Sequence, residues 1–205
     1  YDKLKQFGRI PLPPYIQKHL QDEERYQTVY AQTPGSSAAP TAGLHFTKDV
    51  LEKLKLKGVD TAFITLDVSY DTFRPITSEI ISEHKMHGER YVIPNTTAEK
   101  IKNTKGRIIA VGTTTVRALE SSAINPREVI VGERITDKFI TPGYEFKIID
   151  GMITNFHKPK TSMLLLVSAL CGRDKMLNAY QEALNNNYRF LSFGDCMLIT
   201  RRRKQ

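Results

Sequence analysis

Apolar positions along this chain recur at helical spacing in some segments and at strand spacing in others, and the two kinds alternate. The clearest helical pattern places five residues on one face of a helix: Met176, Leu177, Tyr180, Ala183 and Leu184. Expected helices span residues 47–56, 96–105, 113–121, 161–170 and 176–184, and expected strands span residues 61–68, 107–111, 138–141, 145–149, 152–155 and 196–200. This alternation predicts a layered α/β/α domain with a mixed or mostly parallel sheet.

Capping residues and glycines set the limits of these elements. Thr47 can cap the first helix and Gly58 can end it, while Thr113 can cap the helix that follows Gly112. Residues 107–111 are apolar almost throughout, as in strands buried on both faces of a parallel sheet. We therefore expect a parallel pairing around this strand.

Composition along the chain predicts three parts. The proline-rich start favours an extended connector over residues 1–20, leading from an amino-terminal region that is missing here. Residues 21–200 have the patterning of an α/β catalytic domain, and residues 201–205 form a basic tail.

The apolar runs and the cysteines bear on location. The longest uninterrupted apolar run, residues 163–167, is far shorter than the roughly 20 residues of a membrane-spanning helix. Residues 1–10 have no secretory pattern, and Cys171 and Cys196 are too few for a disulfide framework. We expect a cytoplasmic protein with reduced thiols and no membrane partner.

Charge and glycine spacing narrow the possible ligands. Thirty Lys and Arg against 22 Asp and Glu give a net charge of +8, which is compatible with nucleic acid, although a solvated basic tail explains part of it. The twelve glycines are never closer than the six positions between Gly106 and Gly112. Dinucleotide-binding and Walker A loops are therefore absent, and a nucleotide would have to be held in another way.

A histidine and a helix start are the strongest candidates for chemistry. His45 ends a Gly/Ser/Ala/Pro-rich loop, and a group with an unperturbed pKa of about 6.5 suits proton transfer, although it can equally hydrogen-bond the loop. After Gly112, free N–H groups at a helix start attract anions. Arg117, one turn later, could bind a carboxylate or phosphate, or instead pair with Glu120.

Three other stretches carry weaker signals. His84 and His87 have the spacing of metal ligands but lack further ligands nearby, so we expect no metal. Asn155 and His157 follow an expected strand, where α/β folds place active residues. The stretch around Arg189 interleaves aromatic residues with a cation, which could stack a base or form the edge of a strand.

In their order along the chain, these stretches resemble one family, the S-adenosylmethionine:tRNA ribosyltransferase-isomerases of queuosine biosynthesis. The matching runs are GRIPLPPYI, ERYQTVYA, AAPTAGLHF, HKMHGE, AVGTTTVRALE, TPGYEF, ITNFHKP and NAYQEALNNNYRFLSFGDCMLI. Members of that family are longer, and about their amino-terminal third, with most of a small β-barrel domain, has no counterpart here.

The resemblance implies a reaction and its substrates. The family transfers and isomerises the ribosyl group of S-adenosylmethionine onto 7-aminomethyl-7-deazaguanine at the wobble position of tRNA, giving epoxyqueuosine, adenine and methionine. It implies S-adenosylmethionine as co-substrate and tRNA as partner, and we favour a monomer. A non-catalytic tRNA-binding domain is the alternative; a methyltransferase would normally bring the glycine-rich loop that is absent.

Site residues follow from the matched motifs and from the needs of this chemistry, which are a base, donors for the leaving adenine and an anchor for a carboxylate. The expected catalytic residues are His45 first, then His157 and Asp67. The expected substrate-binding residues are Thr41, Gly43, Thr113, Thr114, Thr115, Arg117, Asn155 and Asp195, and the expected tRNA-binding residues are His87, Lys158 and Arg189.

Two departures from the family pattern affect this assignment. Where the family has Thr-Leu-His-Val-Gly followed by a second glycine, this chain has Asp67 in place of the histidine, Ser69 in place of the first glycine, and no second glycine. If that histidine is the general base, Asp67 must replace it, and the two lost glycines change the backbone angles at the turn. Lys158 replaces a leucine, and the added cation favours contact with the tRNA backbone.

Overall fold

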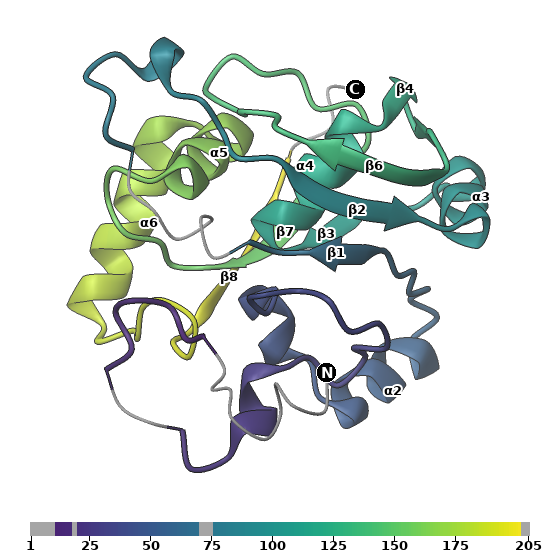
Figure 1. Cartoon of the computed structure of the whole chain (residues 1–205), viewed down its shortest axis with the longest axis horizontal. Helices are drawn as coiled ribbons and strands as arrows, with labels where there is room; N and C mark the ends of the chain where they lie inside the picture. Colours follow the sequence, from purple (N-terminus) through teal and green to yellow (C-terminus); the bar gives the residue numbers. More distant parts are fainter. Residues whose placement is uncertain (1–10, 18–19, 70–75, 202–205) are drawn as a thin grey trace.

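A computed structural model describes residues 11–17, 20–69 and 76–201 of this chain (Figure 1). Much of the expected connector and of the basic tail therefore lies outside the described residues. The architecture is mixed α/β, with two three-stranded sheets and one two-stranded hairpin among the described residues. Within this part of the chain, no helix is long and apolar enough to cross a membrane.

The described helices are η1 (Glu23–Tyr26), η2 (Thr41–His45), α2 (Lys48–Leu56), η4 (Ile81–Glu83), α3 (Asn95–Asn103), α4 (Thr113–Ser121), α5 (Ser162–Cys171) and α6 (Arg173–Asn185). The strands are β1 (Thr65–Asp67), β2 (Glu89–Ile93), β3 (Ile109–Val111), β4 (Ala123–Asn125), β5 (Glu128–Val129), β6 (Gly132–Thr136), β7 (Gly151–Asn155) and β8 (Cys196–Thr200). All five expected α-helices are present.

The two larger sheets differ in strand direction. In the order β1-β2-β6 every pair is antiparallel, with Glu89 opposite Thr136. In the order β3-β7-β8 the first pair is parallel, as expected from residues 107–111, and β8 runs antiparallel to β7. The mixed form of the expected sheet is therefore observed in β3-β7-β8, whereas a single mostly parallel sheet is not.

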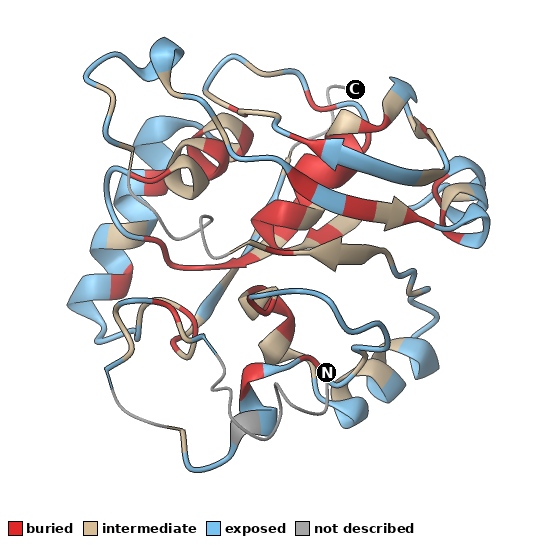
Figure 2. Ribbon diagram, in the orientation of Figure 1, coloured by how far each residue is buried: buried red, intermediate tan, exposed pale blue. Residues whose placement is uncertain are grey.

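Helix α4 lies at the centre of the fold and contacts β3, β7 and β6 (Figure 1). Figure 2 shows it as the most continuously buried helix, and Val116 and Ala118 are fully enclosed. Burial of apolar surface contributes about 25 cal/mol per Å², so this helix anchors both sheets to one core. The start of α4 is consequently held in a fixed position relative to β3 and β7.

Side chains of α4 explain why two expected strands did not form. Residues 138–141 and 145–149 are irregular, since α4 takes up their backbone polar groups. The guanidinium of Arg117 donates to Lys138 O at 3.0 Å, and the Glu120 carboxylate accepts from the backbone N–H groups of residues 147–149 at 2.9–3.1 Å. A backbone satisfied by a buried ion needs no strand partner. The predictions of strands there were wrong, and so was the alternative pairing of Arg117 with Glu120.

Of the two caps expected, that of Thr47 is observed and that of Thr113 is not, and Thr161 adds a cap that was not predicted. The hydroxyl of Thr47 accepts from Val50 N at 3.2 Å, and that of Thr161 accepts from Leu164 N at 3.4 Å. Thr113 does not cap α4, because Gly112 occupies the cap position with φ +91°. That backbone conformation strongly favours glycine. Because Gly112 is the cap, the three threonines that follow it form the first turn of the helix.

Candidate functional site

The predicted site residues gather mainly at one edge of the β3-β7-β8 sheet. Because β3 and β7 are parallel, their carboxyl ends meet, which brings Gly112 beside Ile153 through an N–H···O bond of 2.8 Å. Strand β8 runs the other way, with Cys196 opposite Asn155, so Asp195 reaches the same edge. Such an edge is where α/β sheets place ligands.

A chain of hydrogen bonds joins His45 to this edge. His45 Nε2 lies 2.7 Å from Asn155 Oδ1, and Asn155 Nδ2 donates to Thr41 Oγ1 at 2.9 Å. Since an amide oxygen can only accept, Nε2 carries the hydrogen in this arrangement and Nδ1 is the basic nitrogen of the neutral ring. The structure therefore brings together three predicted residues from two motifs that are far apart in the sequence.

The helix η2, which carries His45, packs so closely against its neighbours that there is no space for a side chain at Gly43. A Cβ on Gly43 would collide with the hydroxyl of Tyr30 and lie 2.7 Å from Thr28 Cγ2. On another side, a Cβ on Gly112 would lie 3.6 Å from the Ala42 methyl group. The start of α4 and the residues around His45 are thus neighbours.

His157 is held in a different environment from His45. It is 8% exposed, its Nε2 lies 2.8 Å from Thr154 Oγ1, and its backbone N–H donates to the Tyr180 hydroxyl at 2.8 Å. Burial lowers its pKa from 6.5 to about 4. The imidazole is therefore neutral at physiological pH and has weak affinity for a proton.

Residues 189–195 form a closed loop beside β7. Asp195 accepts from Arg189 N at 2.7 Å and from its guanidinium at 3.0 Å, and Leu191 N donates to Phe156 O at 3.1 Å. The hydrogen bond from Arg189 is the main cause that lowers the Asp195 pKa, and the charge of His45 contributes in the same direction. Asp195 is consequently an anionic acceptor electrostatically linked to His45.

A shallow hollow, open to solvent, adjoins the first turn of α4. Thr113, Thr114 and Arg117 line it together with Lys138, Ser162 and Met163. Arg117 itself is fully engaged. Its guanidinium pairs with Glu89 and donates to three backbone carbonyls, those of His87, Thr136 and Lys138.

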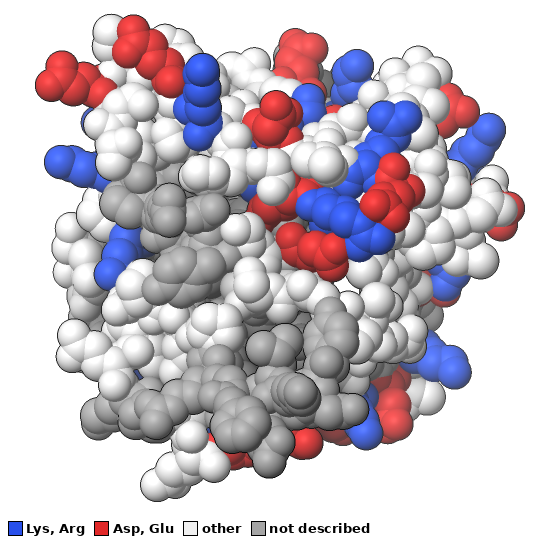
Figure 3. Space-filling view, viewed as in Figure 1, with Lys and Arg blue, Asp and Glu red and all other residues white. Residues whose placement is uncertain are grey.

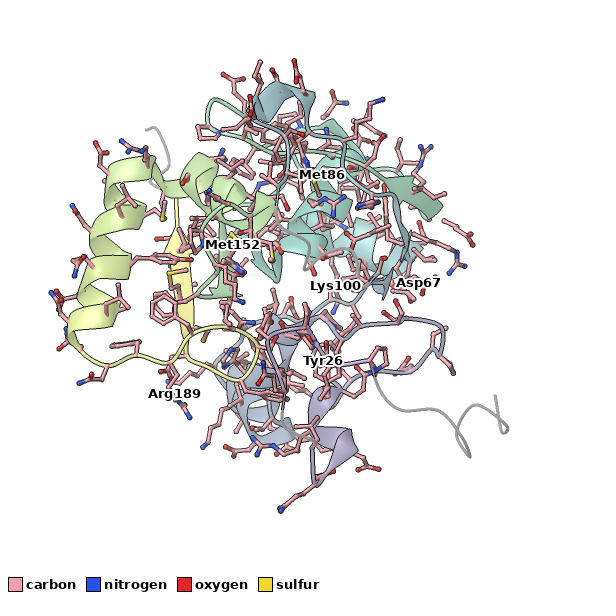
Figure 4. All side chains as sticks on the ribbon, turned by 60° about the vertical axis from the view of Figure 1, so that its left-hand side comes forward. Tyr26, Asp67, Met86, Lys100, Met152 and Arg189 are labelled. Carbon is pink, nitrogen blue, oxygen red and sulfur yellow. The ribbon has the colours of Figure 1, made fainter. Side chains whose placement is uncertain are left out.

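Thr115 and Asp67 are engaged elsewhere. Thr115 donates to Val111 O at 2.7 Å inside the strand-to-helix turn. Asp67 forms an ion pair with Arg90 at 2.5 Å on the β1-β2-β6 sheet. Figure 4 shows Asp67 well apart from Arg189, and no hydrogen bond joins Asp67 to another predicted site residue among the described residues.

The predicted tRNA contacts are exposed. Lys158 lies with Nζ 4.8 Å from the centre of the Tyr15 ring, and the Arg189 side chain is 74% exposed. His87 is also exposed and lies beside Arg117 through its carbonyl. On the face drawn in Figure 3, described basic and acidic residues are interspersed, so the charge of +8 forms no large single-sign patch in that view.

The described residues offer no metal centre, because no three His, Cys, Asp or Glu side chains are grouped as ligands among them. His84 instead packs edge-on against Phe139, with ring centres 5.1 Å apart. The packing and lining roles of Tyr30, Tyr180 and Ser162 were not predicted. The expected helix start at Thr161 could have indicated that Ser162 lines a site, whereas nothing local in the sequence indicated the roles of the two tyrosines.

Comparison with known proteins adds the following. Residues 1–199 match the family described as "Queuosine biosynthesis protein". The chain is 54% identical over 199 residues to "S-adenosylmethionine:tRNA ribosyltransferase-isomerase" from Desulforamulus reducens, covering 96% of this chain and 58% of that relative. It also resembles the crystal structure of S-adenosylmethionine tRNA ribosyltransferase from Thermotoga maritima, with TM-score 0.61, 43% identity, and 77% and 50% of the two chains covered. The chain therefore spans between half and three fifths of these relatives' lengths.

Proposed function

Since this chain belongs to the queuosine biosynthesis protein family, we propose that it carries a site for ribosyl transfer from S-adenosylmethionine to tRNA. The acceptor is the aminomethyl group of 7-aminomethyl-7-deazaguanine at the wobble position, and the products are epoxyqueuosine, adenine and methionine. The observation that carries this proposal is the hydrogen-bonded chain of His45, Asn155 and Thr41 at the carboxyl edge of β3 and β7.

His45 is the proposed general base. The reaction requires removal of a proton beside the sulfonium, followed by opening of the ribose ring and loss of adenine. The Asn155 side chain holds Nε2 and leaves Nδ1 to accept that proton, while Thr41 fixes the orientation of the amide. A hydrogen-bonded orienting group is what a base needs to present one nitrogen to a substrate.

His157 and Asp67 are less suited to that step. His157 is buried with a pKa of about 4, so its role is to hold the end of β7 through Thr154 and Tyr180. The negative charge of Asp67 is already neutralised by its ion pair with Arg90. If Asp67 replaces the family's histidine as the base, it would have to leave Arg90 in order to contact the substrate.

The remaining predicted residues supply binding. Asp195 offers a carboxylate acceptor for a base edge or a ribose hydroxyl, close enough to His45 for their charges to interact. Lys158 directly follows His157, and Arg189 directly precedes the loop of residues 190–195. Both side chains are exposed cations and suit contacts with tRNA phosphates. Phe190 and Tyr188 already pack against Phe156, with ring centres 4.9 Å and 5.9 Å from that of Phe156.

The test is release of adenine from S-adenosylmethionine, with and without tRNA bearing the aminomethyl deazaguanine. This chain and the longer Desulforamulus reducens relative are compared at matched concentrations. Release that depends on the modified tRNA supports the proposal, and activity confined to the longer protein assigns this chain a partial site. If neither protein releases adenine, a tRNA-binding role without catalysis is the better explanation.

Two variants at one position separate the roles of His45. His45→Gln keeps a donor toward Asn155 and loses the titrating nitrogen, whereas His45→Ala loses both. General base catalysis contributes on the order of 10²–10⁴-fold to a rate, so we expect the turnover of both variants to fall by that factor. Thr96→Val on the exposed first turn of α3 is the control. Unchanged turnover in His45→Gln would show that His45 is not the general base.

A further inference from the structure

The hollow beside α4 contains polar groups that no described residue satisfies. Thr113 and Thr114 are each 7% exposed, and no described residue hydrogen-bonds either hydroxyl, in contrast to Thr115, which donates to Val111 O. Both threonines line the hollow. Since neither hydroxyl oxygen is sealed from solvent, both are available to donate to a ligand in the hollow.

Backbone donors point to the same place. The first hydrogen bond within α4 runs from Val116 N to Gly112 O at 3.2 Å, and Gly112 supplies no side-chain cap. The N–H groups of Thr113, Thr114 and Thr115 therefore precede the helical ladder and have no acceptor within the helix. Together with the positive end of the helix dipole, they favour an anion.

The attraction for this anion comes from the first turn of α4 and not from Arg117, and the Lys138 ammonium lies over the Tyr144 ring, 5.3 Å from its centre. The guanidinium of Arg117 already donates to Glu89 and to three backbone carbonyls, and the Glu89 carboxylate neutralises it. Arg117 instead fixes the wall of the hollow by holding the carbonyls of Lys138 and Thr136. It is a positioning residue for this site, which revises its expected role as a direct anchor.

The rest of the wall selects the kind of anion. Met163 and Phe139 line it beside Ser162, and these are apolar or aromatic side chains next to a hydroxyl. A thioether or sulfonium chain packs well against an aromatic ring, and a sulfonium also gains from the ring's negative face. A phosphodiester would have to lose its water against such a wall without a neutralising arginine.

We infer that this hollow binds the amino-acid end of S-adenosylmethionine, with its carboxylate at the first turn of α4 and its thioether chain against Met163 and Phe139. The inference rests on the proposed function and adds to it a location for the methionine half of the donor. That location fits the rest of the site, because Gly112 connects the first turn of α4 to Ala42 and so to the helix that carries His45. Met86, labelled in Figure 4, lines the same hollow.

The experiment measures binding of the product L-methionine directly, without the reaction. Methyl-¹³C methionine is titrated with this chain and followed by NMR line broadening, for the parent and for Thr114→Val, which keeps the shape and removes the hydroxyl. Loss of a hydrogen bond to a charged group should weaken binding roughly tenfold to a hundredfold. Thr96→Val, at the equivalent position of α3 and exposed, should bind as the parent does.

Two competitors define what is recognised. L-methionine methyl ester, which lacks the carboxylate charge, should compete poorly, and a short unmodified RNA oligonucleotide should not compete at all. Competition by RNA and not by methionine would overturn the inference in favour of a backbone phosphate. Equal methionine binding by the parent and Thr114→Val would overturn it as well, as would no methionine binding to a parent that still binds S-adenosylmethionine.

The outcomes separate this inference from the proposed function. Methionine bound through Thr114 without adenine release by either protein contradicts ribosyl transfer and leaves the pocket in place. Conversely, adenine release with an unchanged KM for S-adenosylmethionine in Thr114→Val contradicts the pocket and leaves the transfer reaction intact.

Discussion

Replacing Glu89 with glutamine tests the energetics of the pair that holds the centre of the fold. The change keeps the size of the side chain and removes its charge, leaving the Arg117 guanidinium to the carbonyls of His87, Thr136 and Lys138. The side chains of the pair are 7% and 2% exposed, and burial already lowers the pKa of Arg117 from its ordinary value. Removing one member of a buried pair costs about 3–5 kcal/mol, and since the carbonyls remain we expect about 3 kcal/mol for Glu89→Gln.

Urea denaturation followed by circular dichroism measures this loss, provided that the slope of the transition is unchanged. The matched control is Glu133→Gln in the neighbouring strand β6, because Glu133 pairs with Arg90 on the exposed surface. Surface pairs of this kind add little, so the control should leave the midpoint close to that of the parent. A Glu89→Gln midpoint as close to the parent as that of the control would refute the reasoning.

Three further changes test other parts of the structure. Gly43→Ala should destabilise the chain by about 1–3 kcal/mol, because the added methyl collides with the Tyr30 hydroxyl, and Tyr30→Phe should recover part of that loss in the same denaturation assay. Unfolded His157 takes up a proton near its ordinary pKa of 6.5 and the folded residue near 4, so stability should fall as pH is lowered through this interval, by up to about 3 kcal/mol. His157→Gln should flatten that pH dependence in urea titrations, and a slope equal to that of the parent would contradict it. Lys158→Gln should weaken tRNA binding and reduce its salt dependence by roughly one counterion, whereas the exposed Lys55→Gln should not; equal slopes would exclude Lys158 from the RNA contact.

Local signals in the sequence predicted what depends on local physics. Thr47 was recognisable as a cap, and its hydroxyl accepts the backbone N–H of Val50. Residues 107–111 were apolar enough to predict a buried strand, and β3 pairs in parallel with β7. These features are set by neighbours within one turn or one strand, so a single segment carries the information.

Features that depend on distant partners were harder to predict. Strand β6 was missed because most of its residues are exposed, so it has no apolar run. Glu120 was the nearest acid to Arg117 along the helix, yet the pairing is with Glu89, 28 residues away, because Glu120 is taken by backbone N–H groups. The same holds for the site, where His45 and Asn155 are 110 positions apart and only the fold brings them into contact.

The distribution of the site along the chain has a consequence for its synthesis. His45 meets Asn155, which borders β8 at Cys196, and Tyr15 bonds Ser192 across 177 positions at 2.6 Å. Contacts of such long range form late, since a long loop must close before any of them is gained. Domains fold as units when their last segments emerge, so a nascent chain on the ribosome should display α2 and α3 well before it has a binding site. Pairing of β8 with β7 would then be the step that completes the edge of the sheet where His45 meets Asn155.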